Sequence, residues 1–92
     1  MSDRCVETIT ITHKSGLHAR ASTEFVRLSQ RYESAVFLSR SDGEKVDGKS
    51  IIAILTLGAQ LGDEITIEVE GSDQQDALDA LIDLVKADFH GA

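Results

Sequence analysis

Hydrophobic and polar residues alternate along three segments of this chain, and each alternating segment predicts a strand with one buried face. The segments are residues 7–12, 35–40 and 63–70. Ser41-Asp42-Gly43 follows the second segment, and its Asp-Gly pair is typical of a hairpin turn with positive φ. A short return strand over residues 44–47 is therefore expected.

Apolar residues recur at helical spacing in three further segments. The face of a first helix, over residues 19–31, is formed by Leu17, Ala21, Phe25, Leu28 and Tyr32. A two-turn helix over residues 51–57 is expected between Ser50, a good N-cap, and Gly58, a common C-terminal stop. Ser72 and Gln75 have the spacing of a capping box that opens a last helix. Its apolar face is formed by Leu78, Leu81, Ile82, Val85 and Phe89.

The predicted order of elements is β-α-β-β-α-β-α. Strands that bury one face need a cover, and the three amphipathic helices can supply it. The fold class predicted is therefore α+β, an open-faced β-sandwich with a four-stranded antiparallel sheet covered on one face by three helices. At 92 residues, the chain is expected to form a single domain over residues 1–92.

Charge is distributed unevenly along the chain. Residues 1–50 hold eight Lys and Arg against seven Asp and Glu, whereas residues 51–92 hold one against nine, for a net charge of −7. No basic stripe is available to neutralise phosphates, which argues against nucleic-acid binding, and the acidic half is interpreted as a solvated helix face. The single Cys5, the polar start and the lack of a membrane-length apolar run predict a cytoplasmic protein that does not associate with membranes.

The residues around the start of the first helix are the candidate site. Gly16 allows the backbone to turn, so that His18 falls at or next to the N-cap of the helix. The first turn of a helix offers unpaired N–H groups and the positive end of the helix dipole, which together favour phosphate. Arg20 can reach the oxyanions of a group that His18 attacks. The pattern favours a histidine that accepts and holds a phosphoryl group.

Other motifs are less convincing. Residues 43–50 match the spacing G-x-x-x-x-G-K-[ST] of a nucleotide-binding P-loop, but Gly43 belongs to the predicted hairpin turn and the helix after Ser50 is only two turns long. His13 and His18 lack the further ligands of a zinc site, so no metal or cofactor is expected. Ser15 with His18 lacks a third orienting residue for hydrolase chemistry.

Gly16-Leu17-His18-Ala19-Arg20 resembles the active-site signature of HPr, the histidine phosphocarrier family of the bacterial phosphoenolpyruvate:sugar phosphotransferase system. The segments Thr56-Leu57-Gly58 and residues 63–67 are also similar to that family, which shares the predicted order of elements. The resemblance implies that enzyme I phosphorylates His18, in the family at Nδ1, and that the group passes to the IIA domain of a sugar-specific enzyme II.

The resemblance also implies roles for other residues. Ser15, Ala19 and Arg20 are expected to bind the phosphate, and the chain is expected to act as a monomer. Ser50 is similar to a serine that a dedicated HPr serine kinase/phosphorylase modifies in some bacteria. The surface that docks partners is expected to include Leu17, Arg27, Lys49, Ile51, Ile52 and Leu55.

One residue departs from the family pattern. Ala21 stands where the family usually has a proline, which removes a preset φ from the first turn but no catalytic group. Two alternatives stay open: a regulatory binding module controlled through Ser50, and a phosphocarrier of a nitrogen-related branch with other partners.

Overall fold

The computed structural model describes residues 4–41 and 43–91. Its strands are β1 (Arg4–Thr10), β2 (Ala35–Arg40), β3 (Val46–Asp47) and β4 (Glu64–Glu70). Its helices are α1 (Ala19–Ser29), α2 (Ile51–Leu57), α3 (Gln74–Lys86) and α4 (Asp88–Gly91). Three main helices alternate with the strands in the predicted order, and the predicted fold class is confirmed.

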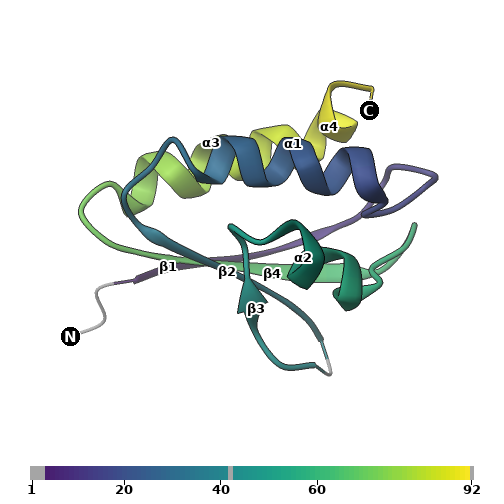
Figure 1. Ribbon diagram of the computed structural model, residues 1–92, viewed down its shortest axis with the longest axis horizontal. Coiled ribbons are helices and arrows are strands. Elements are labelled where there is room, and N and C mark those ends of the chain that lie inside the picture. Colours follow the sequence, from purple (N-terminus) through teal and green to yellow (C-terminus); the bar gives the residue numbers. More distant parts are fainter. Residues whose placement is uncertain (1–3, 42, 92) are drawn as a thin grey trace.

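The four strands form one antiparallel sheet in the order β1-β4-β2-β3. Strand β4 pairs along its whole length with β1 on one side and from Ile65 to Glu70 with β2 on the other. Helices α1 and α3 lie side by side over the sheet, and α2 lies beside α1 near β2 and β3 (Figure 1). The sheet therefore has one face covered by helices and one open face.

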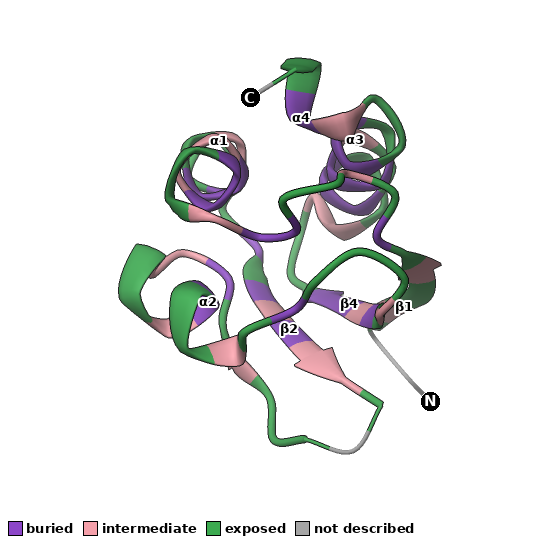
Figure 2. Cartoon of the chain, turned by 90° about the vertical axis from the view of Figure 1, so that its right-hand side faces the viewer, coloured by how far each residue is buried: buried purple, intermediate pink, exposed green. Residues whose placement is uncertain are grey.

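The core lies between the sheet and the helices, where the buried (purple) parts of α1, α3 and the strands face one another (Figure 2). Ile65, Ile67 and Val69 of β4 are fully buried, as their alternation predicted. The facing helices contribute Phe25 from α1 and Ile54 from α2, both without exposed area. Burial of these side chains against β4 is what joins the helical layer to the sheet.

The strand boundaries differ from the prediction where pairing partners are lacking. β1 starts earlier and ends at Thr10, because its ladder with β4 ends at the pair Thr10 and Glu64. β3 is only two residues long, since it pairs with β2 alone. Asp42 of the expected hairpin turn lies outside the described residues.

The predicted capping box of the last helix is also wrong. Helix α3 has Asp73, not Ser72, as its N-cap residue, and the Asp73 side chain makes no capping hydrogen bond within the helix. Its carboxylate instead accepts hydrogen bonds from the backbone N–H groups of Glu33 and Ser34, at 2.9 and 3.0 Å, and from the Ser34 hydroxyl. Asp73 thus ties the start of α3 to the turn before β2, and these bonds lower its pKa below the ordinary value.

The chain does not continue as one helix to Phe89. Helix α3 ends at Lys86, and the following Asp88, Phe89 and His90 have φ values of 51°, 56° and 56°. A left-handed turn of non-glycine residues is strained, and the burial of Phe89, which is 1% exposed, opposes that strain. Phe89 is a core residue as predicted, but it belongs to α4 and not to the face of α3.

The acidic residues of α3 lie on its solvent side, as expected of a solvated helix face. Asp76, Asp79 and Asp83 are exposed, whereas Leu81 of the same helix is fully buried. Among the described residues, no helix is long and apolar enough to cross a membrane.

Replacement of Asp73 by Asn is expected to lower the free energy of unfolding at about pH 7, because the carboxylate gives its hydrogen bonds with Ser34 and Glu33 extra strength. The pKa of Asp73 is lowered in the folded state, so its stabilisation is present above the unfolded pKa of about 3.9 and is lost as the pH falls through the folded value. Urea unfolding should show that the difference in free energy of unfolding between the wild-type chain and Asp73→Asn is smaller at about pH 3 than at about pH 7. The exposed Asp83→Asn is the matched control, and an equal loss in both variants would contradict the role of Asp73.

Candidate active site

The loop between β1 and α1 is held against the segment that follows α2. Gly16 has a φ of +64°, and a Cβ atom there would lie 2.6 Å from the carbonyl oxygen of Ala59 and 2.7 Å from Cα of Gln60. The next N–H group, that of Leu17, donates a hydrogen bond to the Ala59 carbonyl at 2.9 Å. Only glycine combines this φ with this close approach, so Gly16 sets the position of the residues that follow it.

His18 is the N-cap residue of α1, in agreement with the prediction. Its backbone is extended (φ −75°, ψ −178°), and its Nδ1 atom accepts a hydrogen bond from the backbone N–H of Arg20 at 3.2 Å. Its carbonyl accepts the first helical hydrogen bond, from the N–H of Ser22 at 2.9 Å. Nδ1 therefore lies at the positive end of the helix, where the first-turn N–H groups are directed.

The first turn of α1 is formed without the proline that the family usually has. Ala21 is fully buried, and no acidic side chain lies in this turn to oppose an incoming anion. The capping bond of His18 and the hydroxyl of Ser22, which donates to the Leu17 carbonyl at 3.2 Å, hold the turn in place. The helix start is thus maintained by hydrogen bonds where a proline would have fixed φ.

The residues predicted to bind phosphate surround His18 and are accessible. Ser15, Ala19 and Arg20 are all exposed, and His18 itself is half-buried. The N–H of Ser15 donates to Nδ1 of His13 at 3.1 Å. The structure brings these residues together at one end of α1, where they can meet an anion that a partner presents.

Leu17 does not belong to a docking surface. Its side chain is only 4% exposed and packs into the hydrophobic core, so the expectation that it contacts partners is wrong. The helical pattern that begins at Leu17 already indicated an inward-facing residue. Its place in the core anchors the loop next to His18.

Helix α2 presents the expected apolar patch. Ile51, Ile52 and Leu55 are 37%, 74% and 39% exposed, while Ile54 on the opposite face is buried. Ser50 is the N-cap, and its hydroxyl accepts a hydrogen bond from the N–H of Ala53 at 3.2 Å. Because α2 packs against α1, the patch lies on an element that adjoins the helix carrying His18.

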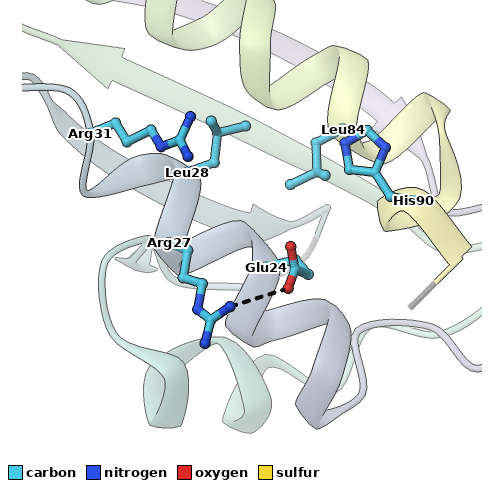
Figure 3. A pocket seen from close by; sticks show the side chains of 6 residues that line it. All are labelled: Glu24, Arg27, Leu28, Arg31, Leu84 and His90. Atoms are coloured by element: carbon cyan, nitrogen blue, oxygen red, sulfur yellow. Dashed lines mark ion pairs between the residues drawn. The ribbon is translucent and has the colours of Figure 1, made fainter.

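Two of the predicted docking cations already have partners within the chain. The Lys49 ammonium donates to the carbonyl of Tyr32 at 2.8 Å, and Arg27 lies 3.8 Å from the carboxylate of Glu24. Arg27 also lines a cleft of about 260 Å³ between α1 and the C-terminal segment (Figure 3). The other residues of the cleft are Glu24, Leu28, Arg31, Leu84 and His90. Of the predicted site residues, the cleft includes Arg27 alone.

The segment with P-loop spacing does not form a phosphate-binding loop. It is divided between a turn at Gly43, the strand β3 and the N-cap Ser50 of a seven-residue helix. A Cβ atom at Gly48 would lie 2.5 Å from the Val36 side chain, so this glycine is needed for packing against β2. In the described part of the chain, no three His, Cys, Asp or Glu side chains are grouped to hold a metal ion.

A second histidine, His13, lies beside His18 and was not predicted as part of the site. The two rings have centroids 5.1 Å apart and are inclined by 50°. The ring of His13 also contacts the edge of Phe89, at 6.1 Å between centroids. Figure 1 shows that the loop after β1 and α4 lie at the same end of the molecule. The five-residue spacing of the histidines was visible in the sequence, but the turn that brings Phe89 to them was not.

Comparison with known proteins agrees with this fold. The family model described as "PTS HPr component phosphorylation site" matches residues 6–87. The chain is 44% identical over 80 residues to phosphocarrier protein HPr of Cupriavidus necator, covering 87% of this chain and 89% of the relative. It is 34% identical over 83 residues to phosphocarrier protein NPr of Escherichia coli, covering 90% of this chain and 92% of the relative.

A solved structure shows the same architecture. The crystal structure of HPr-C-His from Thermoanaerobacter tengcongensis superposes with a TM-score of 0.89 at 36% identity, covering 94% of this chain and 96% of that one. The fold and these matches define a phosphocarrier of the phosphotransferase system. Within that class, the chain belongs to the HPr family.

Replacement of Gly16 by Ala is expected to destabilise the protein more than replacement of Gly62, by at least about 1 kcal/mol. Both glycines have positive φ, which costs alanine about 1–2 kcal/mol, but only at Gly16 does the new Cβ atom meet backbone within 4 Å. Urea unfolding of the two variants measures the difference. Equal losses of unfolding free energy in the two variants would show that the backbone contact between Gly16 and Ala59 is not tight.

Proposed function

We propose that this chain accepts a phosphoryl group from phosphorylated enzyme I on Nδ1 of His18 and passes it to the IIA domain of a sugar-specific enzyme II. The observation that supports the proposal best is the position of Nδ1 at the first turn of α1, bonded to the Arg20 N–H, in a chain of the HPr family. The transfer occurs within transient complexes, in which each partner supplies half of the reacting groups.

The transfer step follows from this geometry. The Nδ1 lone pair of His18 attacks phosphorus, and the bond from phosphorus to the donor atom of enzyme I breaks, with its electron pair returning to enzyme I. The Arg20 N–H, which loses Nδ1 as its acceptor, then donates to a phosphoryl oxygen. The exposed Arg20 guanidinium and the Ser15 hydroxyl supply further donors, so the charge of the transferring group is met by preorganised hydrogen bonds.

The apolar patch of α2 is proposed as the centre of the partner interface. Exposed Ile51, Ile52 and Leu55 can be covered by an apolar partner surface, while the charged side chains of Arg20, Arg27 and Lys49 form the rim. Lys49 and Arg27 would have to exchange intramolecular partners for intermolecular ones, which limits what they add to affinity.

Ser50 is proposed as a regulatory phosphorylation site of an HPr serine kinase/phosphorylase. Its hydroxyl is half-buried at the start of α2 and is one residue from Ile51 of the patch. A phosphate there would put negative charge beside an apolar interface and would weaken the docking of partners. This arrangement also supports the alternative of a regulatory binding module, in which Ser50 matters more than His18.

The assignment to the sugar branch is the most specific part of the proposal. Relatives named HPr and NPr share about the same portion of the chain, so the nitrogen-related branch is the alternative with the same chemistry. Purified IIA domains of both branches, offered as acceptors, distinguish the two. We also propose that the chain works as a cytoplasmic monomer without a cofactor, because the exposed site needs access to two different partners in turn.

With enzyme I, phosphoenolpyruvate and magnesium, the protein is expected to gain one acid-labile phosphoryl group, and His18→Ala should abolish the gain. Arg20→Ala should slow it about five- to ten-fold, because an exposed charged donor to the phosphate is lost. Intact-protein mass spectrometry over time measures both effects.

Arg31→Ala is the matched control, because Arg31 is an exposed arginine of the turn directly after α1 and lies outside the proposed site. A gain that persists in His18→Ala would contradict the carrier role. If Ser50→Ala removed a partner interaction that His18→Ala left intact, the regulatory module would be the better description.

Replacement of Ile52 by Ser is expected to raise the KM for this chain as substrate of enzyme I by about three- to ten-fold, with kcat nearly unchanged. The reason is that Ile52, the most exposed residue of the patch, would contribute to binding but not to the chemistry. Initial rates at varied concentration of the chain measure the two constants.

Val6→Ser is the control for the loss of an exposed apolar side chain. Val6 is 49% exposed and belongs to β1, away from α2. Equal KM values for both variants would place the docking surface somewhere other than the α2 patch.

A further inference from the structure

Two backbone N–H groups of the site each donate to Nδ1 of a histidine. The N–H of Ser15 donates to His13 at 3.1 Å, and the N–H of Arg20 donates to His18 at 3.2 Å. A ring nitrogen that accepts a hydrogen bond carries no proton, so in these contacts a neutral ring has its proton on Nε2. The Arg20 N–H would lose its acceptor if Nδ1 of His18 were phosphorylated.

His13 is held in a fixed position next to His18. The His13 ring is half-buried, lies 5.1 Å from the His18 ring between centroids, and meets Phe89 in an edge-on contact at 6.1 Å. Phe89 is itself buried, and the Thr12 hydroxyl donates to the Asp88 carboxylate at 2.5 Å, which ties the loop to α4. A charge on His18 therefore interacts electrostatically with the His13 ring, whose position is fixed by its packing against Phe89.

We propose that His13 takes up a proton when His18 is phosphorylated, and that the resulting imidazolium stabilises the phosphoryl group. This inference rests on the proposed function, because it requires phosphorylation at His18. It makes His13 a positioning residue for the phosphoryl group, not an acceptor of it.

Phosphorylation of His18 would change the hydrogen bonding of His13. The phosphoryl group brings about two negative charges and several strong acceptor oxygens. In the proposed step the Ser15 N–H moves from His13 Nδ1 to a phosphoryl oxygen, and Nδ1 is the atom that takes up the proton. Water or buffer then gives a proton to that nitrogen, and no bond to phosphorus forms or breaks. When the phosphoryl group leaves for the next acceptor, the proton returns to solvent and Ser15 bonds to His13 again.

Several charged groups of the described residues lie on the loop of His13 or on the elements next to it. Lys14 lies on the same loop and Arg20 on α1, and both are exposed. From α4, Asp88 contributes a carboxylate through its bond with Thr12, and His90 is exposed on the side that lines the cleft. The proposal requires no change of charge in these groups, because the phosphoryl group on His18 is what favours the imidazolium of His13.

The test is the equilibrium of phosphoryl transfer between enzyme I and this chain, measured by mass spectrometry at about pH 6 and about pH 8.5, on the two sides of the range in which imidazole titrates. Proton uptake on phosphorylation makes the phosphorylated form more favourable as the pH falls. His13→Asn keeps an acceptor for the Ser15 N–H but cannot become charged. It should lower the equilibrium constant about five-fold at the lower pH and hardly change it at the higher one.

Two further variants separate charge from packing. His13→Lys, which is charged at both pH values, should retain the phosphoryl group at both and lose the pH dependence. His90→Asn is the matched control, because it removes an exposed histidine of α4 and Asn tolerates the positive φ there. A purely structural role for His13 would instead make Asn and Lys equally damaging at both pH values, and that result would overturn the proposal.

A measurement without variants completes the test. In ¹⁵N NMR spectra at a constant pH near 7, the His13 ring should change from the neutral to the imidazolium pattern when His18 is phosphorylated. An unchanged His13 ring in a chain phosphorylated at His18 would overturn this inference and leave the carrier function standing. A wild-type chain that takes up no phosphoryl group on His18 would overturn the carrier function, and the role of His13 with it.

Discussion

The backbone of Gly16 lies against the backbone of Ala59, and the geometry of the candidate site depends on this approach. The glycine has a φ of +64° and no room for a Cβ atom, while the neighbouring Leu17 N–H donates to the Ala59 carbonyl. Leu17 then enters the core, which fixes the direction in which the chain continues into α1. His18 is consequently held at the helix N-terminus between a buried residue and an exposed turn, where an imidazole can be presented to a partner without a pocket of its own.

The distribution of charge serves the same arrangement. The first turn of α1 has no acidic residue, so its N–H groups and Arg20 present a positive local field although the chain as a whole carries −7. Asp76, Asp79 and Asp83 of the C-terminal half lie on the solvent face of α3, whereas Asp73 uses its carboxylate to join α3 to the turn before β2. A negative net charge and a locally positive helix end are therefore compatible, because the two occupy different parts of the surface.

Much of the fold was predictable because it depends on local patterns. The alternation in β4 and the helical spacing in α1 each identify a buried face within one segment, and Ser50 and Gly58 mark the ends of α2 through their own capping chemistry. The candidate site was predictable to the same extent: an N-cap histidine followed by an exposed arginine is a local feature. The errors occurred at Ser72 and Leu17, where a partner distant in sequence or the packing of the core outweighed the local preference.

By itself, then, the sequence determined the order of the elements and the placement of His18 at a helix start, because periodicity and capping act over a few residues. Only the tertiary structure decided that Asp73 bonds to Ser34 and that Leu17 is buried, since each requires two segments to meet. It also decided that His13 lies beside His18 with Phe89 behind it, because the left-handed turn after α3 is stabilised by burial and not by any local preference of its residues.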